Sequence, residues 1–263
     1  MGRYETMFAR NQGVFGAFVM LGDPDLETSA AILDQLVEGG ADMIEVGIPF
    51  SDPVADGPVI QAAAVRALAQ GVRTADCFAL IRGFRDRHPD VPIGILTYAN
   101  LVLARGRDAF YLGAAAAGAD SVLVADVPLL EAEPWAASAR AAGIAPVLIA
   151  AANTPAARLA RIAALGEGYT YCVARSGVTG ADTRVRFDHE AMLAALREAG
   201  APPPIFGFGI SRPEHVRAAL DAGAAGVISG SAIVDLVGRG EPVRAFVESM
   251  KAATYPLCSA GTG

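Results

Sequence analysis

The sequence contains very little lysine, and this shortage excludes a class of chemistry. Lys251 is the only lysine among 263 residues, and it lies near the C-terminus in a stretch that is typical of a helix. Catalysis through a Schiff base, on a carbonyl group or with pyridoxal phosphate, needs a lysine in the site. The sequence therefore predicts a reaction that does not use this mechanism.

Histidine and cysteine are also scarce and scattered, so neither a zinc site nor a disulfide framework is expected. The residues of these two types are Cys77, Cys172, Cys258, His88, His189 and His215. None lies at metal-ligand spacing from a second histidine or cysteine, and the cysteines are odd in number and far apart. This usage predicts no metal site and favours a reducing, cytoplasmic location.

Long apolar runs and an excess of basic residues are missing as well. No stretch reaches the roughly 20 apolar residues that cross a bilayer, and the N-terminus lacks the apolar core of a signal peptide. Although Gly2 and Thr6 fit a loose myristoylation pattern, this segment is better explained by a short amphipathic helix with Tyr4, Met7 and Phe8 facing inward. The net charge of −7 argues against a nucleic-acid surface, which needs a basic patch.

The sequence does contain a repeated passage from helix to strand. Helix-like segments end in a small-residue turn and continue as an apolar, β-branched run at 38–46, 116–124 and 221–229, and more loosely at 141–149 and 198–206. The glycine of each turn is expected to end its helix in a left-handed conformation. Thr28, and Thr154 followed by Pro155, are the expected helix caps.

This repeat predicts βα units around a parallel sheet. We expect strands near 14–20, 43–48, 92–97, 121–125, 145–150, 169–173, 204–208 and 226–229, and helices near 28–38, 59–70, 75–88, 107–117, 130–142, 155–164, 188–199, 213–222 and 241–253. About eight such units favour an α/β fold, a single (β/α)8 TIM barrel with a short extra N-terminal helix, over an open doubly wound sheet. We expect one domain over residues 1–263, with a disordered tail from about 256 to 263.

The stretch from 42 to 58, D-M-I-E-V-G-I-P-F-S-D-P-V-A-D-G-P, contains the strongest candidates for chemistry. Glu45 lies in the middle of an apolar strand, where an ionised carboxylate is costly to bury. Asp52 and Asp56 follow in a loop, beside Phe50 and Ile60. One acid inside the strand and two above it predict the wall of a small-molecule site.

Two glycine-rich loops near the end of the chain predict a phosphate site. Gly207 and Gly209 would let backbone N–H groups approach an anion, and Gly230 and Ser231 open a helix whose dipole favours negative charge. The loops after the last two strands are the usual phosphate position in such barrels. The alternative is that these glycines only turn the chain.

Several other residues have both a functional and a structural interpretation. The loop 174–182, A-R-S-G-V-T-G-A-D, is either a lid that contacts the ligand through Thr179 or an ordinary mobile loop. The carboxyl group of Glu45 is either catalytic or held by hydrogen bonds, for example from Tyr171 or Tyr98. Asp126 is either a site acid or the cap of the helix that follows it. Phe18, Leu96 and Phe208 either belong to the core or line an aromatic-sized pocket.

Seven motifs taken together resemble one known family, the alpha subunit of tryptophan synthase. They are G-I-P-F-S-D-P-V-A-D-G-P, A-N-L-V, S-V-L-V-A-D-V-P, G-Y-T-Y, A-R-S-G-V-T-G, G-F-G-I-S and I-S-G-S-A-I-V. They occur in the family's order, and the resemblance extends from Tyr4 to about Lys251. It implies a (β/α)8 barrel that cleaves indole-3-glycerol phosphate to indole and glyceraldehyde 3-phosphate, a step in tryptophan biosynthesis that needs neither a metal nor a cofactor.

The resemblance also implies roles for particular residues. The family's catalytic glutamate and aspartate fall on Glu45 and Asp56, and its supporting tyrosine falls on Tyr171. The phosphate contacts expected in this way are Thr179, Gly180, Phe208, Gly209, Gly230 and Ser231. Phe18, Ile60, Leu96 and Tyr98 are the further candidates for contact with the substrate. The family's partner is a beta subunit that holds pyridoxal phosphate and receives indole through a tunnel in an alpha2–beta2 assembly, and Asp52 falls on a loop position associated with that contact.

Three other functions fit parts of this pattern. A different metal-free lyase or epimerase acting on a phosphosugar would use the same barrel and the same phosphate loops. A non-catalytic subunit would bind phosphate and activate a partner without using Glu45. A purely structural barrel would not bind glycerol phosphate, so assays of indole release and phosphate binding distinguish these alternatives.

Overall fold

The computed structural model describes residues 2–173 and 189–255, and within them a parallel sheet closes into a barrel. Its strands are β1 (Val14–Met20), β2 (Met43–Gly47), β3 (Ile93–Thr97), β4 (Ser121–Val124), β5 (Ala145–Pro146), β6 (Leu148–Ala151), β7 (Thr170–Val173), β8 (Pro204–Phe206) and β9 (Gly226–Ser229). The order β5-β4-β3-β2-β1-β9-β8-β7-β6 places β5 and β6 at its two ends. Since only Val147 separates these two strands, and its N–H donates to the Val122 carbonyl at 3.1 Å, the chain itself closes the barrel.

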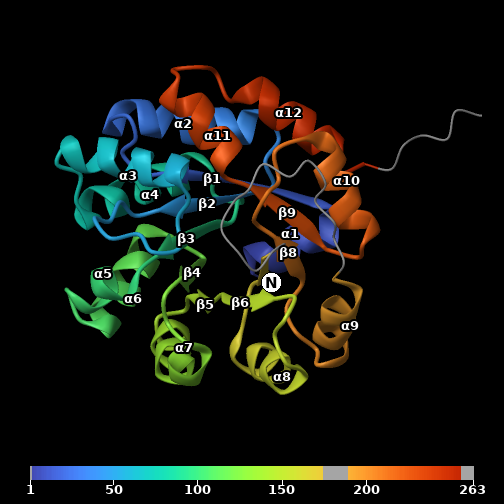
Figure 1. Cartoon of the computed structure of the whole chain (residues 1–263). Coiled ribbons are helices and arrows are strands. Elements are labelled where there is room, and N and C mark those ends of the chain that lie inside the picture. The colour runs from blue at the N-terminus through green and yellow to red at the C-terminus, as the bar shows by residue number, and fades with distance from the viewer. Residues whose placement is uncertain (1, 174–188, 256–263) are drawn as a thin grey trace, which may run out of the picture.

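Helices surround the central strands on the outside (Figure 1). They are α1 (Arg3–Arg10), α2 (Leu26–Glu38), α3 (Pro58–Ala69), α4 (Thr74–Arg87), α5 (Ala99–Leu103), α6 (Arg107–Ala117), the 3₁₀ turn η1 (Leu129–Glu131), α7 (Ala132–Ala141), α8 (Ala156–Leu165), α9 (Glu190–Glu198), α10 (Pro213–Asp221), α11 (Ser231–Gly238) and α12 (Arg244–Ala252). Strands covered in this way are apolar on both faces, and β1 is buried along its whole length.

The predicted (β/α)8 barrel and its N-terminal helix are confirmed, with differences in detail. The strand expected at 145–150 is divided into β5 and β6, and the short helix α5 was not expected. The glycine turns are as predicted, since Gly118 and Gly223 follow α6 and α10 with φ of 93° and 96°. The tail expected from about 256 lies outside the described residues.

Both predicted helix caps were wrong. Asp25, and not Thr28, caps α2, because the Thr28 N–H donates to the Asp25 carboxylate at 2.8 Å. The Thr154 hydroxyl accepts from the Ala151 N–H at 2.9 Å in the turn before α8, and the cap position itself is Pro155. Aspartate and threonine both suit a cap position, so composition alone does not choose between neighbouring candidates.

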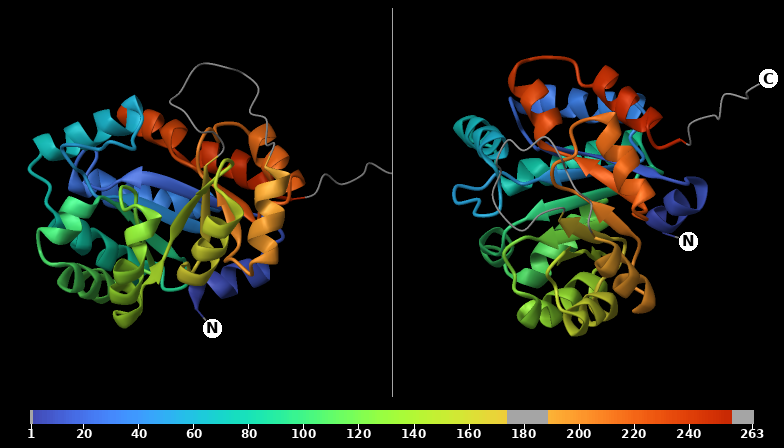
Figure 2. Two further views of the ribbon diagram at one scale, coloured as in Figure 1. Left: turned by 60° about the horizontal axis from the view of Figure 1, so that its bottom comes forward. Right: turned by 45° about the vertical axis from the view of Figure 1, so that its right-hand side comes forward.

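The N-terminal helix α1 closes the end of the barrel at which the strands begin (Figure 2, left). Tyr4 points into the barrel, where its hydroxyl lies 2.7 Å from the Ser121 hydroxyl. The Asp120 carboxylate, just before β4, joins α1 and α4 at this end of the barrel, because it forms ion pairs with Arg3 at 2.9 Å and with Arg85 at 2.7 Å. The expected inward face is confirmed for Tyr4 and Met7, which are buried, and Phe8 is half-buried against the same core.

The single lysine, on α12 near the C-terminus, binds residues that precede β1 and β2 at the end of the barrel where the strands begin. The Lys251 ammonium on α12 donates to both Asp42 oxygens at 2.8 Å and to the Asn11 side chain at 3.3 Å. The other Asp42 partner is the Phe15 N–H in β1, at 2.7 Å. Lys251 is therefore a structural residue, remote from the loops that follow the strands.

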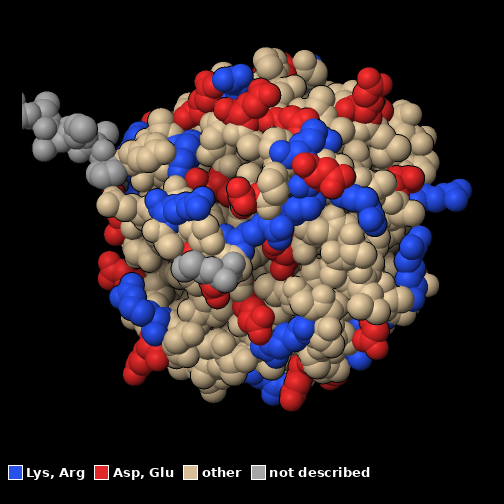
Figure 3. Space-filling view, turned by 180° about the vertical axis from the view of Figure 1, so that it is seen from behind, with Lys and Arg blue, Asp and Glu red and all other residues tan. Residues whose placement is uncertain are grey.

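The surface carries charges of both signs. Figure 3 shows acidic and basic side chains interspersed over one face, without a continuous patch of either sign. None of the helices among the described residues is long and apolar enough to span a membrane.

Candidate active site

Glu45 lies inside the barrel on β2 and is 1% exposed. The Tyr169 hydroxyl donates to its Oε1 atom at 2.6 Å. Burial raises the pKa of Glu45 to about 7, the hydrogen bond from Tyr169 opposes this shift, and the nearby charge of Asp56 adds to it. A carboxyl group with this pKa exchanges its proton near neutral pH, which suits acid–base catalysis.

The hydrogen-bond partner of Glu45 is Tyr169, and not Tyr171 or Tyr98 as the sequence suggested. Tyr169 is 1% exposed, and its ring also lies 5.5 Å from that of Tyr4. Side chains two apart on a strand point to the same side, so the spacing in G-Y-T-Y indicates that Tyr169 and Tyr171 both face the interior. That signal was available in the sequence, but it does not show which tyrosine reaches the carboxyl group.

Tyr171 lies against the glycine-rich end of β8. A Cβ atom at Gly207 would come within 2.0 Å of the Tyr171 ring, so only glycine leaves room for it. The rings of Tyr171 and Phe208 meet edge to face at 6.2 Å. Burial raises the pKa of Tyr171 well above its ordinary value, with smaller contributions from Glu45 and Asp56, so its phenol stays protonated at neutral pH.

Asp56 is half-buried in the loop between β2 and α3. Burial raises its pKa, and a hydrogen bond from the Tyr98 hydroxyl lowers it. That hydroxyl also accepts from the Ala55 N–H at 3.3 Å. Asp56 thus faces the same interior as Glu45, while Asp52 in the same loop is exposed and accepts from the Ser51 hydroxyl at 2.5 Å.

The apolar candidates line the barrel above Glu45. Phe18, 3% exposed, lies on β1 between Gly47 and Gly230, because a Cβ at either glycine would come within 2.9 or 3.4 Å of the Phe18 ring. Leu96 is the next-to-last residue of β3, Ile60 lies in the first turn of α3, and both are half-buried against the core. Since side chains from β1, β3 and α3 meet here, the interior offers an apolar wall for a flat ring.

The glycine-rich loops lie at the ends of β8 and β9. Gly209 has a φ of 79°, which glycine adopts without strain, and Phe208 is 42% exposed. Gly230 and Ser231 begin α11, whose first N–H groups point away from the helix. Glycine loops and a helix start of this kind suit an anion. Thr179 and Gly180, the remaining two phosphate candidates, lie outside the described residues.

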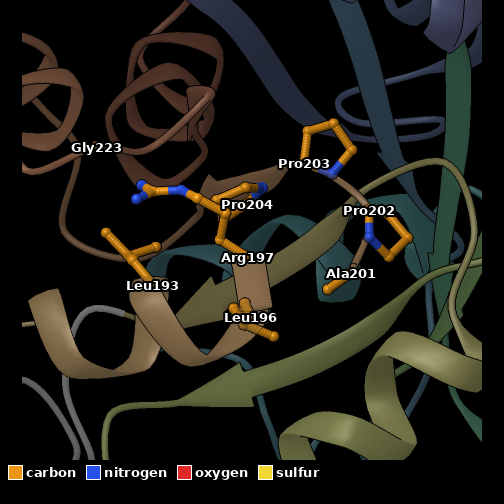
Figure 4. Close-up of a pocket in the computed structure, with 8 residues that line it drawn as sticks. All are labelled: Leu193, Leu196, Arg197, Ala201, Pro202, Pro203, Pro204 and Gly223. Atoms are coloured by element: carbon orange, nitrogen blue, oxygen red, sulfur yellow. The ribbon is translucent and has the colours of Figure 1, made fainter. Parts of the chain in front are cut away.

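Two further hollows lie away from this interior. One, of about 220 Å³, lies where β8 begins, between α9 and the end of α10 (Figure 4). The other, of about 320 Å³, lies between α3 and α11. No cluster of three or more histidine, cysteine, aspartate or glutamate residues that could hold a metal ion occurs among the described residues.

The fold and the site first define a class, a (β/α)8-barrel protein with a buried carboxyl group of raised pKa inside the barrel. The model of one family, described as "Tryptophan synthase alpha chain", matches residues 4–257. The chain therefore belongs to the tryptophan synthase alpha chain family, whose members are lyases that cleave indole-3-glycerol phosphate to indole and glyceraldehyde 3-phosphate in tryptophan biosynthesis.

Individual relatives agree with this assignment. The tryptophan synthase alpha chain of Shewanella amazonensis is 52% identical over 97% of this chain and 100% of its own length, and that of Klebsiella pneumoniae is 53% identical over 97% and 99%. Among solved structures, tryptophan synthase subunit alpha from Legionella pneumophila superposes with a TM-score of 0.85 at 29% identity, over 97% of this chain and 98% of that one. A chain of the tryptophan synthase complex from Pyrococcus furiosus superposes with a TM-score of 0.81 at 33% identity, over 92% and 99%. The predicted family, fold and lyase activity are thus confirmed.

Proposed function

We propose that Glu45 and Asp56 are the catalytic residues of this lyase, with Tyr171 supporting them. The observation that carries the proposal is the position of the Glu45 carboxyl group, which is buried inside the barrel, accepts from the Tyr169 hydroxyl and lies near a second acid, so that burial raises its pKa to about 7. A carboxyl group of this kind can both donate and accept a proton in one turnover.

In the proposed reaction Glu45 acts twice. Its carboxyl group first donates a proton to C3 of the indole ring, and the ring nitrogen takes up the positive charge. The bond from C3 to the glycerol side chain then breaks, and its electron pair restores the aromatic ring. The Glu45 carboxylate accepts the proton of the glycerol hydroxyl as this carbon becomes the aldehyde, so the enzyme regains its proton.

Asp56 would stabilise the charge that develops in this step. Its carboxylate would accept the indole N–H and offset the positive charge on the ring nitrogen. The hydrogen bond from Tyr98 favours the ionised form that this role requires. Tyr171 would close the same interior from the opposite side, with Phe18, Ile60, Leu96 and Tyr98 holding the ring.

The phosphate group would bind at the ends of β8 and β9. Backbone N–H groups of Gly209, Gly230 and Ser231 would donate to its oxygens, and Phe208 would cover it. Thr179 and Gly180 complete this proposed site. Because backbone N–H groups supply the donors, the scarcity of lysine in this chain does not weaken the proposal.

We further propose a partner for this chain, a tryptophan synthase beta subunit in an alpha2–beta2 assembly. Members of the family need no cofactor of their own, and pyridoxal phosphate belongs to the beta subunit. Asp52 is exposed in the loop after β2, and exposed apolar side chains follow β2, β3 and β4, namely Val54 in the same loop, Leu103 in α5 and Leu130 in η1. Such a group of exposed apolar side chains at one end of a barrel is typical of an interface.

Two general features complete the proposal. The chain would act as one domain, because its buried apolar side chains form one cluster from α1 to α12. It would work in the cytoplasm, in keeping with the free, buried Cys77 and Cys172.

The test is indole release from indole-3-glycerol phosphate by purified Glu45→Gln and Asp56→Asn variants, alone and with a beta subunit. Removing a positioned acid should lower the rate roughly 10²- to 10⁴-fold. Glycerol phosphate should still bind both variants, which separates a catalytic defect from loss of the fold. Full activity of Glu45→Gln would end the assignment.

A further inference from the structure

We propose that Asp126 is a positioning residue for Asp56, and that it acts through the start of α5 and the side chain of Tyr98. The proposal rests on the catalytic role of Asp56 given above. It concerns three neighbouring loops, which follow β2, β3 and β4 and carry Asp56, Tyr98 and Asp126.

Asp126 caps a helix that belongs to the neighbouring loop. The sequence suggested that it caps the helix following it in the chain, but its Oδ1 atom accepts from the Ala99 N–H at 2.8 Å. Ala99 is the first residue of α5, and the cap residue of this helix, Tyr98, offers no side-chain bond to the helix N–H groups. Asp126 therefore supplies the carboxylate that a short helix needs at its start.

Tyr98 connects this capped helix to the loop that holds Asp56. It is 2% exposed, and its ring stacks on Phe50 with centroids 5.4 Å apart. Its hydroxyl accepts from the Ala55 N–H at 3.3 Å, and the same hydroxyl lowers the pKa of the neighbouring Asp56 carboxyl group. Tyr98 thus contacts the segment after β2 at Phe50, where the segment begins, and near Ala55 and Asp56, where it ends.

Within residues 2–173 and 189–255, the other hydrogen bonds of the loop around Asp56 are short-range. The Val54 N–H donates to the Asp52 carbonyl at 3.0 Å, the Asp56 N–H donates to the Pro53 carbonyl at 3.1 Å, and the Gln61 side chain donates to the Asp56 carbonyl at 2.7 Å. Such bonds fix the shape of the loop but not its position over the barrel. Its position depends on Tyr98, and the position of Tyr98 depends on the start of α5.

Displacement of Tyr98 would affect the reaction in a specific way. Among the described residues, the titratable groups around Asp56 include Tyr98, Glu45 and Tyr171: a hydrogen bond from Tyr98 lowers the pKa of Asp56, and the charge of Asp56 raises the pKa values of Glu45 and Tyr171. Of these, Tyr98 stabilises the carboxylate by a hydrogen bond, so its loss raises the pKa of Asp56. The acid limb of the rate profile should then move to higher pH, and a misplacement of about 1 Å can cost on the order of 10²-fold in rate.

The experiment compares kcat, KM and the pH profile of indole release for four single variants, one double variant and one control variant, with and without a beta subunit. Asp126→Ala and Ala99→Pro remove the two ends of the same hydrogen bond. Proline suits the first position of a helix, and Tyr98 already has the extended backbone that precedes proline. Asp126→Asn keeps an acceptor oxygen at the cap, and Tyr98→Phe removes only the hydroxyl.

We expect Asp126→Ala and Ala99→Pro to lower kcat at least about tenfold with little change in KM, and to move the acid limb to higher pH. Asp126→Asn should keep most of the activity. The double variant Asp126→Ala/Tyr98→Phe should be no slower than Tyr98→Phe alone, because both changes break one connection. The exposed Asp108→Ala in the first turn of α6 is the matched control and should not change kcat.

An unchanged kcat and pH profile in both Asp126→Ala and Ala99→Pro would overturn the proposal. So would additive losses in the double variant, or an Asp126→Asn variant as slow as Asp126→Ala. The role of Asp56 is tested separately: if Asp56→Asn is inactive while the Asp126 variants are normal, only the positioning role fails. If Asp56→Asn is fully active, the proposed function itself fails.

Discussion

The carboxyl group of Glu45 binds its proton more tightly in the folded protein than in the unfolded chain. Its pKa rises from an ordinary value of 4.5 to about 7, chiefly because burial disfavours the charged form. The stabilising effect of this proton is complete below about pH 4.5 and is lost as the pH rises through 7. A difference of this size corresponds to about 3 kcal/mol, since one pKa unit is about 1.4 kcal/mol.

We therefore expect Glu45→Gln to stabilise the protein at high pH. At pH 8.5 the variant should unfold at a higher urea concentration than the parent, and its free energy of unfolding should be greater by as much as about 3 kcal/mol. This difference in free energy should shrink toward pH 4.5. The exposed Glu198→Gln serves as the control and should show no such pH dependence. A stability difference that stays constant between pH 4.5 and 8.5 would contradict the raised pKa.

The hydroxyl of Tyr169 should set the pH at which the enzyme loses activity on the basic side. It donates to Glu45 and so lowers the pKa of that carboxyl group. In Tyr169→Phe the pKa of Glu45 should rise, and the basic limb of the kcat/KM profile should move to higher pH, because the proposed reaction starts from the protonated form. A limb that stays in place, measured by indole release between pH 5 and 9, would argue against Glu45 as the proton donor.

At the scale of elements, the N-terminal N–H groups of α5 and α11 have different partners in the proposed enzyme. The first N–H of α5 is bound by a protein carboxylate from another loop. The start of α11, at Gly230 and Ser231, receives no side-chain bond from its cap residue. A helix start without a side-chain cap beside a glycine loop suits a phosphate oxygen.

A negative charge placed at this point should weaken phosphate binding. We expect Gly209→Asp to lower the affinity for glycerol phosphate at least about tenfold, since hydrogen bonds to a charged group are worth roughly 1.5–3 kcal/mol. Calorimetric titration measures this change directly. Gly240→Asp is the matched control, because Gly240 is also exposed and also has a positive φ, of 70°, but lies beyond the end of α11. Equal affinity in the Gly209 variant and the parent would exclude the proposed phosphate site.

At the scale of the whole molecule, the ion pairs that stabilise the barrel and the proposed catalytic residues lie at opposite ends of it. The end where the strands begin is closed by α1 and fastened by the Asp120 and Asp42 ion pairs. The opposite end, where the strands finish, carries Asp56, Tyr98 and the glycine-rich loops after β8 and β9. This division is expected in (β/α)8 barrels, where the loops after the strands vary and the other end supports the fold.

Lys251 should accordingly matter for stability and not for the reaction. Its ion pair with Asp42 is largely buried, with both side chains 11% exposed, and removal of one partner leaves an unpaired charge. We expect Lys251→Met to lower the free energy of unfolding by about 3 kcal/mol. The double variant Lys251→Met/Asp42→Asn should recover part of this loss, while kcat at 25 °C stays unchanged in both. A Lys251→Met variant as stable as the parent in urea would contradict this role.

The sequence alone determined the repeating pattern of helix and strand, which favours a (β/α)8 barrel over an open sheet. Apolar runs that follow glycine-ended helices define βα units, because local backbone preferences and periodicity are properties of neighbouring residues. It also singled out Glu45, since an acid in an otherwise apolar strand is unusual wherever the strand is placed. The motif resemblance gave the family and the lyase reaction, which the comparisons confirmed.

Only the tertiary structure decided which side chains meet. Tyr169 and Glu45 are 124 residues apart in the chain, Asp126 and Ala99 are 27 apart, and Lys251 and Asp42 are 209 apart. Each contact depends on how the strands pair and on where the barrel closes, and a difference of one position along a strand turns a side chain to the other face. Periodicity predicts the strands but not their register, so the contacts around Glu45 and Asp56 could be read only once the barrel had closed.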